Sequence, residues 1–169
     1  MEDDIIAKAN IGGARKQARG LLKTAKVTQA PILIKNLLPT LREQFDIAIV
    51  QTNGLPSKCD AITTNIDGKI TISCNSSKPI TRRKFSAAHE LGHLHMGHVH
   101  SGGRVDYRST NLNETEANAF AAELIMPLDM LKKDIAGKVN GIKEMAIRYE
   151  VSEEAMGWRL VETNLFKKM

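Results

Sequence analysis

The sequence has few cysteines and no long apolar run. Among its 169 residues only Cys59 and Cys74 are cysteines, and neither belongs to a C-x-x-C pair or lies at ligand spacing from a histidine. We therefore expect two reduced thiols. The apolar runs, such as Ile47–Val50 and Leu124–Leu128, are far shorter than the roughly 20 residues of a membrane-spanning helix. The acidic residues after Met1 also differ from the basic start of a secretory signal, so we expect a cytoplasmic protein without a membrane segment.

The composition is that of a globular protein. Hydrophobic residues make up 42% and charged residues 25%, which excludes a disordered, collagenous or coiled-coil chain. The length is typical of one domain, so we expect residues 1–169 to form a single domain. Lys and Arg total 24 against 19 Asp and Glu, a net charge of +5. This mild surplus is compatible with nucleic acid or an acidic partner, but the basic residues are spread along the chain, which favours a solvated surface.

Apolar spacing and turn residues predict strands followed by helices. The strand pair flanks Asp67-Gly68, the signal for a type I′ hairpin, and helix signals dominate after Thr81. In chain order we predict a helix over about 14–26, a short helix over 40–45, strands over 47–50, 61–66 and 69–73, and then helices separated by a loop that includes Gly102-Gly103 and residues 111–113. This order is typical of an α+β fold, here a small, mainly antiparallel sheet packed on a helical half.

An H-E-x-x-H motif lies in the first predicted helix after the strands, as His89-Glu90-Leu91-Gly92-His93. Side chains at positions i and i+4 of a helix lie on one face, about 5–6 Å apart at Cβ, so the two imidazoles can bind one ion. Glu90, next to the first histidine, can reach a water at the open coordination position. The motif therefore predicts a zincin-type active-site helix that supplies two metal ligands and a general base.

A catalytic zinc site has three protein ligands, so one more must come from elsewhere. The longer pattern H-E-x-x-H-x-x-G-x-x-H needs glycine at 96 and histidine at 99, where this chain has Met96 and Val99. We therefore do not expect the third ligand among His95, His98 and His100. They are predicted to face solvent, with weak binding of an inhibitory or second metal as the alternative.

The third ligand is predicted on the helix over residues 113–127. Its apolar stripe consists of Ala117, Phe120, Ala121, Leu124 and Ile125. Glu114 lies on the same face, whereas Glu116 aligns with Glu123, which we expect to be exposed. Glu114 is therefore the predicted ligand and Glu116 the alternative, and a helix-dipole role for Glu114 is the interpretation without a metal. Asn118 is placed to hydrogen-bond a ligand histidine or Glu114.

Two segments, residues 82–93 (RRKFSAAHELGH) and 114–127 (ETEANAFAAELIMP), closely resemble the ImmA/IrrE family of metallo-endopeptidases. The resemblance implies that Zn²⁺ is bound by His89, His93 and Glu114 and that Glu90 is the general base. Mn²⁺ is a second metal to test in vitro. The resemblance also implies a protein substrate, a phage-type or stress-related helix-turn-helix repressor encoded nearby.

Residues 141–166 have the pattern of a helix-turn-helix, in which Ser152 caps the second helix. Glu153 and Glu154 occupy the first turn of that helix and would repel DNA phosphates, so we favour packing or protein docking over direct DNA binding.

Three functions remain open at this point, and the least favoured is a DNA-binding regulator that uses the C-terminal helices. The first is a cytoplasmic zinc endopeptidase that cuts a specific protein, with the extended substrate added to the edge of strand 62–66 or 69–73. The second is a non-catalytic zinc-containing binding module or toxin–antitoxin component. Glu90 favours the first, because a structural zinc needs no base beside it.

Overall fold

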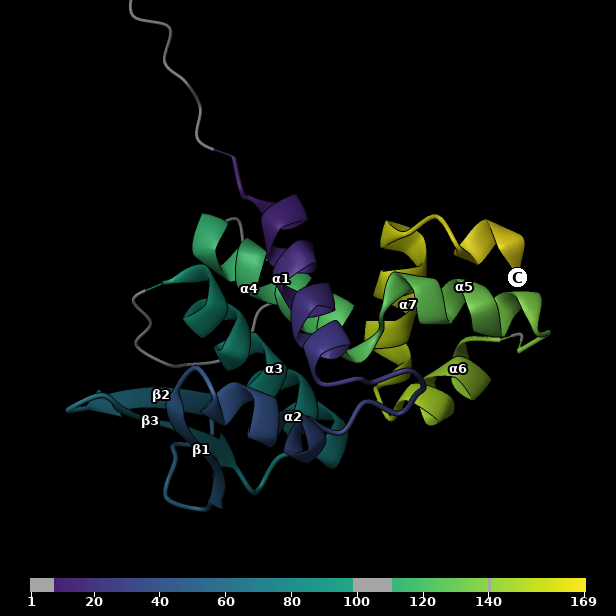
Figure 1. Ribbon diagram of the computed structural model, residues 1–169. Coiled ribbons are helices and arrows are strands. Elements are labelled where there is room, and N and C mark those ends of the chain that lie inside the picture. The colour runs from purple at the N-terminus through teal and green to yellow at the C-terminus, as the bar shows by residue number, and fades with distance from the viewer. Residues whose placement is uncertain (1–7, 99–110, 140) are drawn as a thin grey trace, which may run out of the picture.

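The computed structural model describes residues 8–98, 111–139 and 141–169, and Figure 1 shows their arrangement. The acidic N-terminus, His100 and Gly102-Gly103 lie outside the described residues. The elements are α1 (Ile11–Thr24), α2 (Ile34–Arg42), β1 (Asp46–Thr52), β2 (Ala61–Ile66), β3 (Lys69–Asn75), α3 (Ile80–Met96), α4 (Leu112–Ile125), α5 (Leu128–Ala136), α6 (Ile142–Tyr149), α7 (Glu153–Glu162) and the 3₁₀ turn η1 (Phe166–Lys168). Helices combined with one small sheet confirm the α+β class.

The sheet has strand order β1-β3-β2 and is mixed. Strands β2 and β3 form the predicted antiparallel hairpin, and Asp67 and Gly68 both have positive φ, 51° and 83°, as a type I′ turn requires. Strand β1 instead pairs with β3 in parallel. The expectation of a mainly antiparallel sheet is therefore corrected. After β1 the chain crosses to the far edge of the sheet and forms β2 there, and the hairpin then brings it back as the central strand β3.

Helix α2 is the largest departure from the predicted boundaries. It spans Ile34–Arg42 and contains Pro39, whereas the sequence predicted a helix over 40–45. Proline inside a helix removes one backbone hydrogen bond. The burial of Leu37 and Leu41, which are at most 1% exposed, outweighs that loss.

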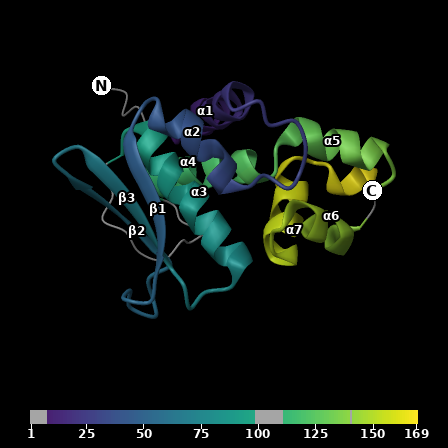
Figure 2. The same cartoon turned by 60° about the horizontal axis from the view of Figure 1, so that its bottom comes forward.

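Helix α3 lies across one face of the sheet and forms the centre of the fold (Figures 1 and 2). The sheet face that it covers carries Ile70, Ile72 and Cys74 of β3, all buried. In β2, Ala61 and Thr63 lie on the same face, because they pair with Cys74 and Ile72 of β3. Every residue of α3 from Phe85 to His93 is buried, so the H-E-x-x-H motif lies inside the molecule.

Helix α4 packs on α3, and α1 packs on α4. Small residues allow this close packing, since Ala14 and Ala18 of α1 and Ala117 and Ala121 of α4 are completely buried. The result is a layered arrangement in which the sheet, α3, and then α4 with α1 follow one another. This arrangement brings the start of α4 next to the second half of α3.

Helices α5, α6 and α7 gather at the end of the molecule opposite the sheet (Figure 2). The predicted helix, turn and capped helix are confirmed, because Glu150 ends α6 with a φ of 51° and the Ser152 side chain accepts a hydrogen bond from Ala155 N. Arg159 of α7 is 2% exposed and anchors this group to α4 through an ion pair with Glu123 and a 3.1 Å hydrogen bond from Nε to the Met126 carbonyl.

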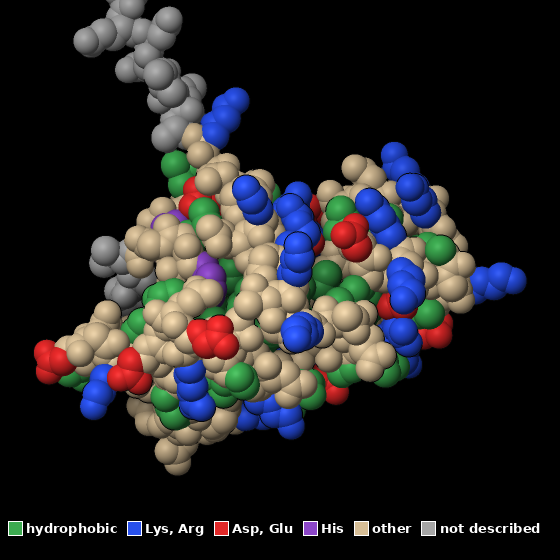
Figure 3. Space-filling view, in the orientation of Figure 1, with side chains coloured by type: hydrophobic (Ala, Val, Ile, Leu, Met, Phe, Trp, Pro, Cys, Tyr) green, Lys and Arg blue, Asp and Glu red, His purple; other side chains and the backbone are tan. Residues whose placement is uncertain are grey.

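Figure 3 shows Lys and Arg side chains dispersed among other side chains over the visible face, rather than gathered in one patch. No helix among the described residues is both long and apolar enough to cross a membrane.

Candidate metal centre

The two motif histidines converge from successive turns of α3. His89 and His93 are 1% and 3% exposed, and their Nε2 atoms lie 3.0 Å apart. The i,i+4 spacing of the motif produces this arrangement, as the sequence predicted. Both imidazoles therefore turn the same nitrogen toward one point in the interior.

Glu114 reaches that point from the first turn of α4. Its Oε2 lies 3.2 Å from His89 Nε2 and its Oε1 lies 3.2 Å from His93 Nε2. Asn111 caps the helix just before it, because the Asn111 side chain accepts hydrogen bonds from the backbone N–H groups of Asn113 and Glu114. The cap fixes the turn from which the Glu114 carboxylate extends.

The three side chains could hold one metal ion, since their candidate ligand atoms all lie within 4.8 Å of one another. In a tetrahedral site with metal–ligand bonds of about 2.0–2.1 Å, neighbouring ligand atoms are about 3.3 Å apart. The separations of 3.0 and 3.2 Å among His89, His93 and Glu114 are close to that value. Two imidazole nitrogens and a carboxylate also form a donor set that zinc accepts, so the residues fit the metal that the motif implies.

A hydrogen-bond partner holds each imidazole from behind. The Nδ1 of His89 lies 2.9 Å from Asn118 Oδ1, and the Nδ1 of His93 lies 3.0 Å from His98 Nδ1. If the Nε2 atoms bind an ion, the hydrogen of each imidazole is on Nδ1, and both rings then donate to these partners. Asn118 therefore contacts His89, the position in which the sequence predicted it.

Glu116, the alternative ligand, points elsewhere. Its Oε2 lies 2.8 Å from His98 Nε2, and its Oε1 accepts a hydrogen bond of 2.6 Å from the backbone N–H of Asn10. His98 thus lies between Glu116 and His93, and Glu116 reaches His93 only through His98. The side chain of His98 is 8% exposed, so the expectation that it faces solvent was wrong.

His95 is partly buried and packs against aromatic rings rather than facing solvent. Its ring packs between Phe45 and Phe120, with centroid distances of 5.5 and 4.9 Å, and its Nδ1 lies 2.9 Å from the Leu91 carbonyl. Desolvation by burial lowers the pKa of His95 below its ordinary value of 6.5. The ring of His95 therefore packs beside the core instead of extending into solvent.

Glu123 is the other sequence expectation that the structure corrects. The sequence predicted that Glu123 is exposed, and Glu116 was predicted to be exposed because it aligns with Glu123. In the structure Glu123 is 1% exposed and pairs with Arg159. The partner lies 36 residues further along the chain, so local periodicity could not reveal it.

Glu90 is buried on the side of α3 that faces β2. It is 1% exposed, and its Oε2 accepts a short hydrogen bond from the Thr63 hydroxyl. Sequence reasoning did not identify Thr63. The available signal was strand alternation, because Thr63 is two residues after the buried Ala61 and therefore on the face that α3 covers.

Both cysteines are free thiols. Cys74 lies in β3, where burial, and secondarily the negative charge of Glu90, raise its pKa to about 11. Neither thiol belongs to the group of side chains that could hold the metal among the described residues.

Comparison with known proteins agrees with the sequence motifs. The Peptidase_M78 family, described as an IrrE N-terminal-like domain, matches residues 42–161. No curated protein matches the chain. A solved structure, a Mycobacterium tuberculosis transcriptional regulator, has the same fold, with a TM-score of 0.66 at 17% identity over 88% of this chain. The chain spans 46% of the length of that regulator. The family match covers most of the chain, including the motif helix and α4, and the chain therefore belongs to the Peptidase_M78 family of IrrE N-terminal-like domains.

Proposed function

We propose that this chain is a zinc-dependent endopeptidase that cuts a specific protein substrate. The observation that carries the proposal is that candidate ligand atoms of His89, His93 and Glu114 lie within 4.8 Å of one another. Glu90 lies next to His89 in α3. Membership of a metallopeptidase family supports it independently.

The residues around the site supply the parts that peptide hydrolysis needs. A zinc ion held by His89, His93 and Glu114 would polarise the scissile carbonyl and lower the pKa of a water molecule to about 7. Glu90 accepts a proton from the attacking water and returns it to the leaving amine nitrogen. The hydroxyl of Thr63 holds the Glu90 carboxylate in one orientation. Asn118 and His98 keep the ligand rings in the tautomer that offers Nε2 to the ion.

The number of ligands favours catalysis over a structural zinc. A structural site normally has four protein ligands, whereas a catalytic site has three and one open position. Within residues 8–98, 111–139 and 141–169 the candidate metal group contains three side chains. The alternative of a non-catalytic binding module therefore has less support, and it also gives no role to the buried Glu90.

The substrate is expected to bind in extended form along β2. Strand β3 lies between its neighbours, so of the two strands of the hairpin β2 is at the edge of the sheet. An added strand on β2 would run past Thr63 and its partner Glu90. This geometry suits a linker or a locally unfolded segment of a protein.

The proposed partner is the helix-turn-helix repressor that the ImmA/IrrE resemblance implies. The name of the M. tuberculosis structure, a transcriptional regulator, is compatible with a role in transcription. Glu153 and Glu154 are exposed at the start of α7, which continues to disfavour direct DNA binding.

The experiment is to incubate the purified chain, loaded with Zn²⁺ or Mn²⁺, with the repressor encoded beside it and separately with casein. We expect a single cut in the repressor that a chelator abolishes. Broad digestion of casein would contradict the specific-protease proposal in favour of a general peptidase. Stable binding of the repressor without cleavage would favour the binding module.

A further inference from the structure

Lys84 is a partly buried lysine that has no role in the chemistry described above. Its side chain is 9% exposed, and its Nζ donates a hydrogen bond of 2.7 Å to the Tyr149 carbonyl. Glu150 Oε2 lies 3.9 Å from the same nitrogen. Tyr149 is the last residue of α6 and Glu150 is its C-cap. Lys84 therefore joins the first half of α3 to the end of α6.

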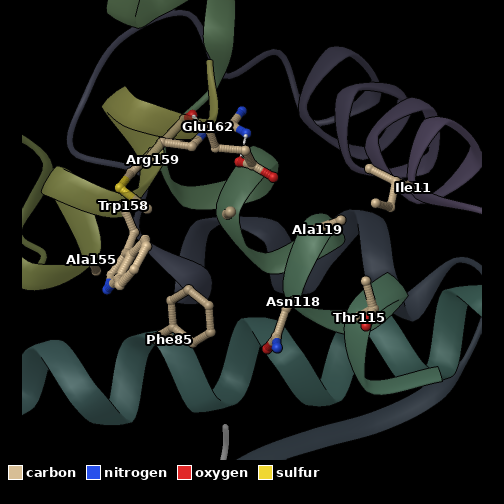
Figure 4. Close-up of a pocket in the computed structure, with 11 residues that line it drawn as sticks. Ile11, Phe85, Thr115, Asn118, Ala119, Ala155, Trp158, Arg159 and Glu162 are labelled. Carbon is tan, nitrogen blue, oxygen red and sulfur yellow. Dashed lines mark hydrogen bonds and ion pairs between the residues drawn. The ribbon is translucent and has the colours of Figure 1, made fainter. Parts of the chain in front are cut away.

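Lys84 and the next residue, Phe85, line two different cavities. Figure 4 shows the cavity of Phe85, which has a volume of about 230 Å³ and in which Trp158 of α7 lies beside the Phe85 ring. Lys84 lines a second cavity, of about 490 Å³, between the start of α3 and helices α6 and α7. We call this second cavity the Lys84 cavity.

The Lys84 cavity has an apolar wall that is partly exposed to solvent. Ile80, Ala146, Ile147 and Val151 contribute to its lining. Ile80 and Ile147 are 72% and 69% exposed, the highest values among the large apolar side chains of the described residues. The volume is within the roughly 300–1,000 Å³ typical of small-molecule sites. An apolar group that enters the cavity would therefore remove exposed hydrocarbon from water.

The charges of the Lys84 cavity are balanced, and its buried amine is reactive. Lys143, Glu150 and Glu153 also line the cavity, so two lysines face two carboxylates. Burial lowers the pKa of Lys84 to about 8, against the opposing effect of the Glu150 charge. An ordinary lysine has a pKa of about 10.4 and is almost entirely protonated at pH 8. The amine of Lys84 is partly neutral at that pH, and the neutral form is the nucleophile.

We propose that Lys84 is a site of acylation by thioesters, and that the attached acyl chain occupies the Lys84 cavity. The lone pair of Nζ attacks the thioester carbonyl carbon, the C–S bond breaks, and the sulfur leaves as a thiolate with the bonding electrons. The nitrogen loses one proton to solvent. The products are an amide at Lys84 and a free thiol, so no oxidant or reductant takes part. The proposal does not rest on the proposed peptidase function.

The surroundings of Lys84 fit the amide product. The amide nitrogen retains one N–H, which can donate to the Tyr149 carbonyl as the amine does. The product is uncharged, so burial no longer opposes it. The contact given up is the 3.9 Å ion pair with Glu150, whose side chain is 52% exposed, and such exposed pairs contribute little to stability. The acyl chain can lie against Ile80 and Ile147, which line the same cavity.

The first test measures which lysines react. The purified chain is incubated at pH 8 with a limiting amount of butanoyl-coenzyme A, and peptide mass spectrometry gives the acylated fraction of each lysine. Lys84 should react at least about tenfold faster than Lys143, which is exposed in the same cavity, and than the exposed Lys132 of α5. In urea-unfolded chain the difference should disappear. Equal rates in the folded chain, or a difference that persists in urea, would overturn the proposal.

The second test measures the part that the cavity takes. Each CH₂ that leaves water contributes up to about fourfold to a rate or binding constant, so the rate at Lys84 should rise from acetyl to butanoyl to hexanoyl thioester. Ile147→Ser should weaken this preference. Val161→Ser, at a 55% exposed position of α7 outside the cavity lining, is the matched control and should keep it. A rate at Lys84 that does not depend on chain length, or a preference that Ile147→Ser leaves intact, contradicts the role of the cavity.

The third test uses pH to identify the nucleophile. The ratio of acylation at Lys84 to acylation at Lys132 should fall as the pH rises from 8 to 10. Exposed lysines still gain neutral amine over this range, whereas Lys84 has already lost much of its proton at pH 8. Both rates are read from the same sample, so hydrolysis of the thioester affects them equally. A ratio that stays constant or rises would overturn the proposal.

Discussion

Gly92 of α3 lies directly against the backbone of Ala117 of α4. A Cβ on Gly92 would come 2.9 Å from both the Ala117 Cα and its carbonyl oxygen, and 3.1 Å from Phe120 Cβ. Backbone atoms at this distance cannot move aside without a shift of the whole helix. The glycine of the motif therefore sets the spacing between α3 and α4, which in turn sets how far Glu114 is from the two histidines.

Gly92→Ala should weaken both the fold and the metal site. Overpacking of a buried contact typically costs about 1–3 kcal/mol, so we expect the free energy of unfolding of the metal-free protein to fall by that amount. Because α4 must move, Zn²⁺ affinity should fall as well. Urea unfolding and competition with a chromogenic chelator measure the two effects.

Gly20→Ala is the matched control, since a Cβ at Gly20 in α1 meets nothing within 4 Å. Alanine in a helix interior is favoured over glycine by roughly 0.5–1 kcal/mol, so this variant should be more stable with unchanged metal affinity. Equal behaviour of the two glycine variants would contradict the close-packing argument.

Glu114→Ala should lose stoichiometric zinc, whereas Glu116→Ala should retain it. Both oxygens of Glu114 face the histidine Nε2 atoms, but those of Glu116 face His98 and the Asn10 backbone. Metal analysis of the purified variants after dialysis distinguishes them. The reverse result would make Glu116 the ligand.

His98→Ala should lower zinc affinity by about 10–100-fold without removing the site, as is typical for partners of metal ligands. Glu116→Ala should have a similar effect, because Glu116 acts on His93 through His98. The double variant should therefore bind zinc about as tightly as either single variant. Additive losses in chelator competition would show that the two side chains act separately.

Lys84 should make stability rise with pH in the alkaline range. Burial lowers the pKa of Lys84 from 10.5 to about 8, although its Nζ donates to the Tyr149 carbonyl at 2.7 Å. Between those two pH values the unfolded chain binds a proton at this site that the folded chain has released, so the free energy of unfolding increases with pH.

The comparison of Lys84→Met with the parent chain isolates this contribution. We expect the free energy of unfolding, measured with urea, to increase for the parent relative to the variant as the pH rises from about 8 to 10.5. Lys132→Met, at an exposed position in α5, should show the same pH dependence of the free energy of unfolding as the parent. A constant difference between parent and Lys84→Met over this range would contradict the pKa shift.

The helix that carries the H-E-x-x-H motif and the convergence of its two histidines could be predicted because their pattern is local. The spacing of His89 and His93 places both rings on one helix face whatever the rest of the chain does. Strand pairing on either side of Asp67-Gly68 was predictable for the same reason, since the turn residues alone specify the hairpin.

Unlike Asn118, the positions of Thr63, Glu123 and His98 could not be predicted, because they depend on how segments apart in the chain pack together. Thr63 meets Glu90 only when the sheet packs on α3, and Glu123 becomes buried only when α7 brings Arg159 against α4. His98 was set aside because its spacing does not fit a ligand, yet the chain turns after α3 and places the ring behind His93. The parallel pairing of β1 with β3 is likewise a choice of topology that strand patterns do not encode.

The Glu90→Gln variant tests the central claim most directly. Zinc content and cleavage of the neighbouring repressor are measured on the same preparation, with the parent chain beside it. Removal of a general base typically costs about 10²–10⁴-fold in rate, and here the base also positions the water, so we predict full zinc content with cleavage reduced by at least that factor. Cleavage at near the parental rate by the zinc-loaded variant would contradict the account.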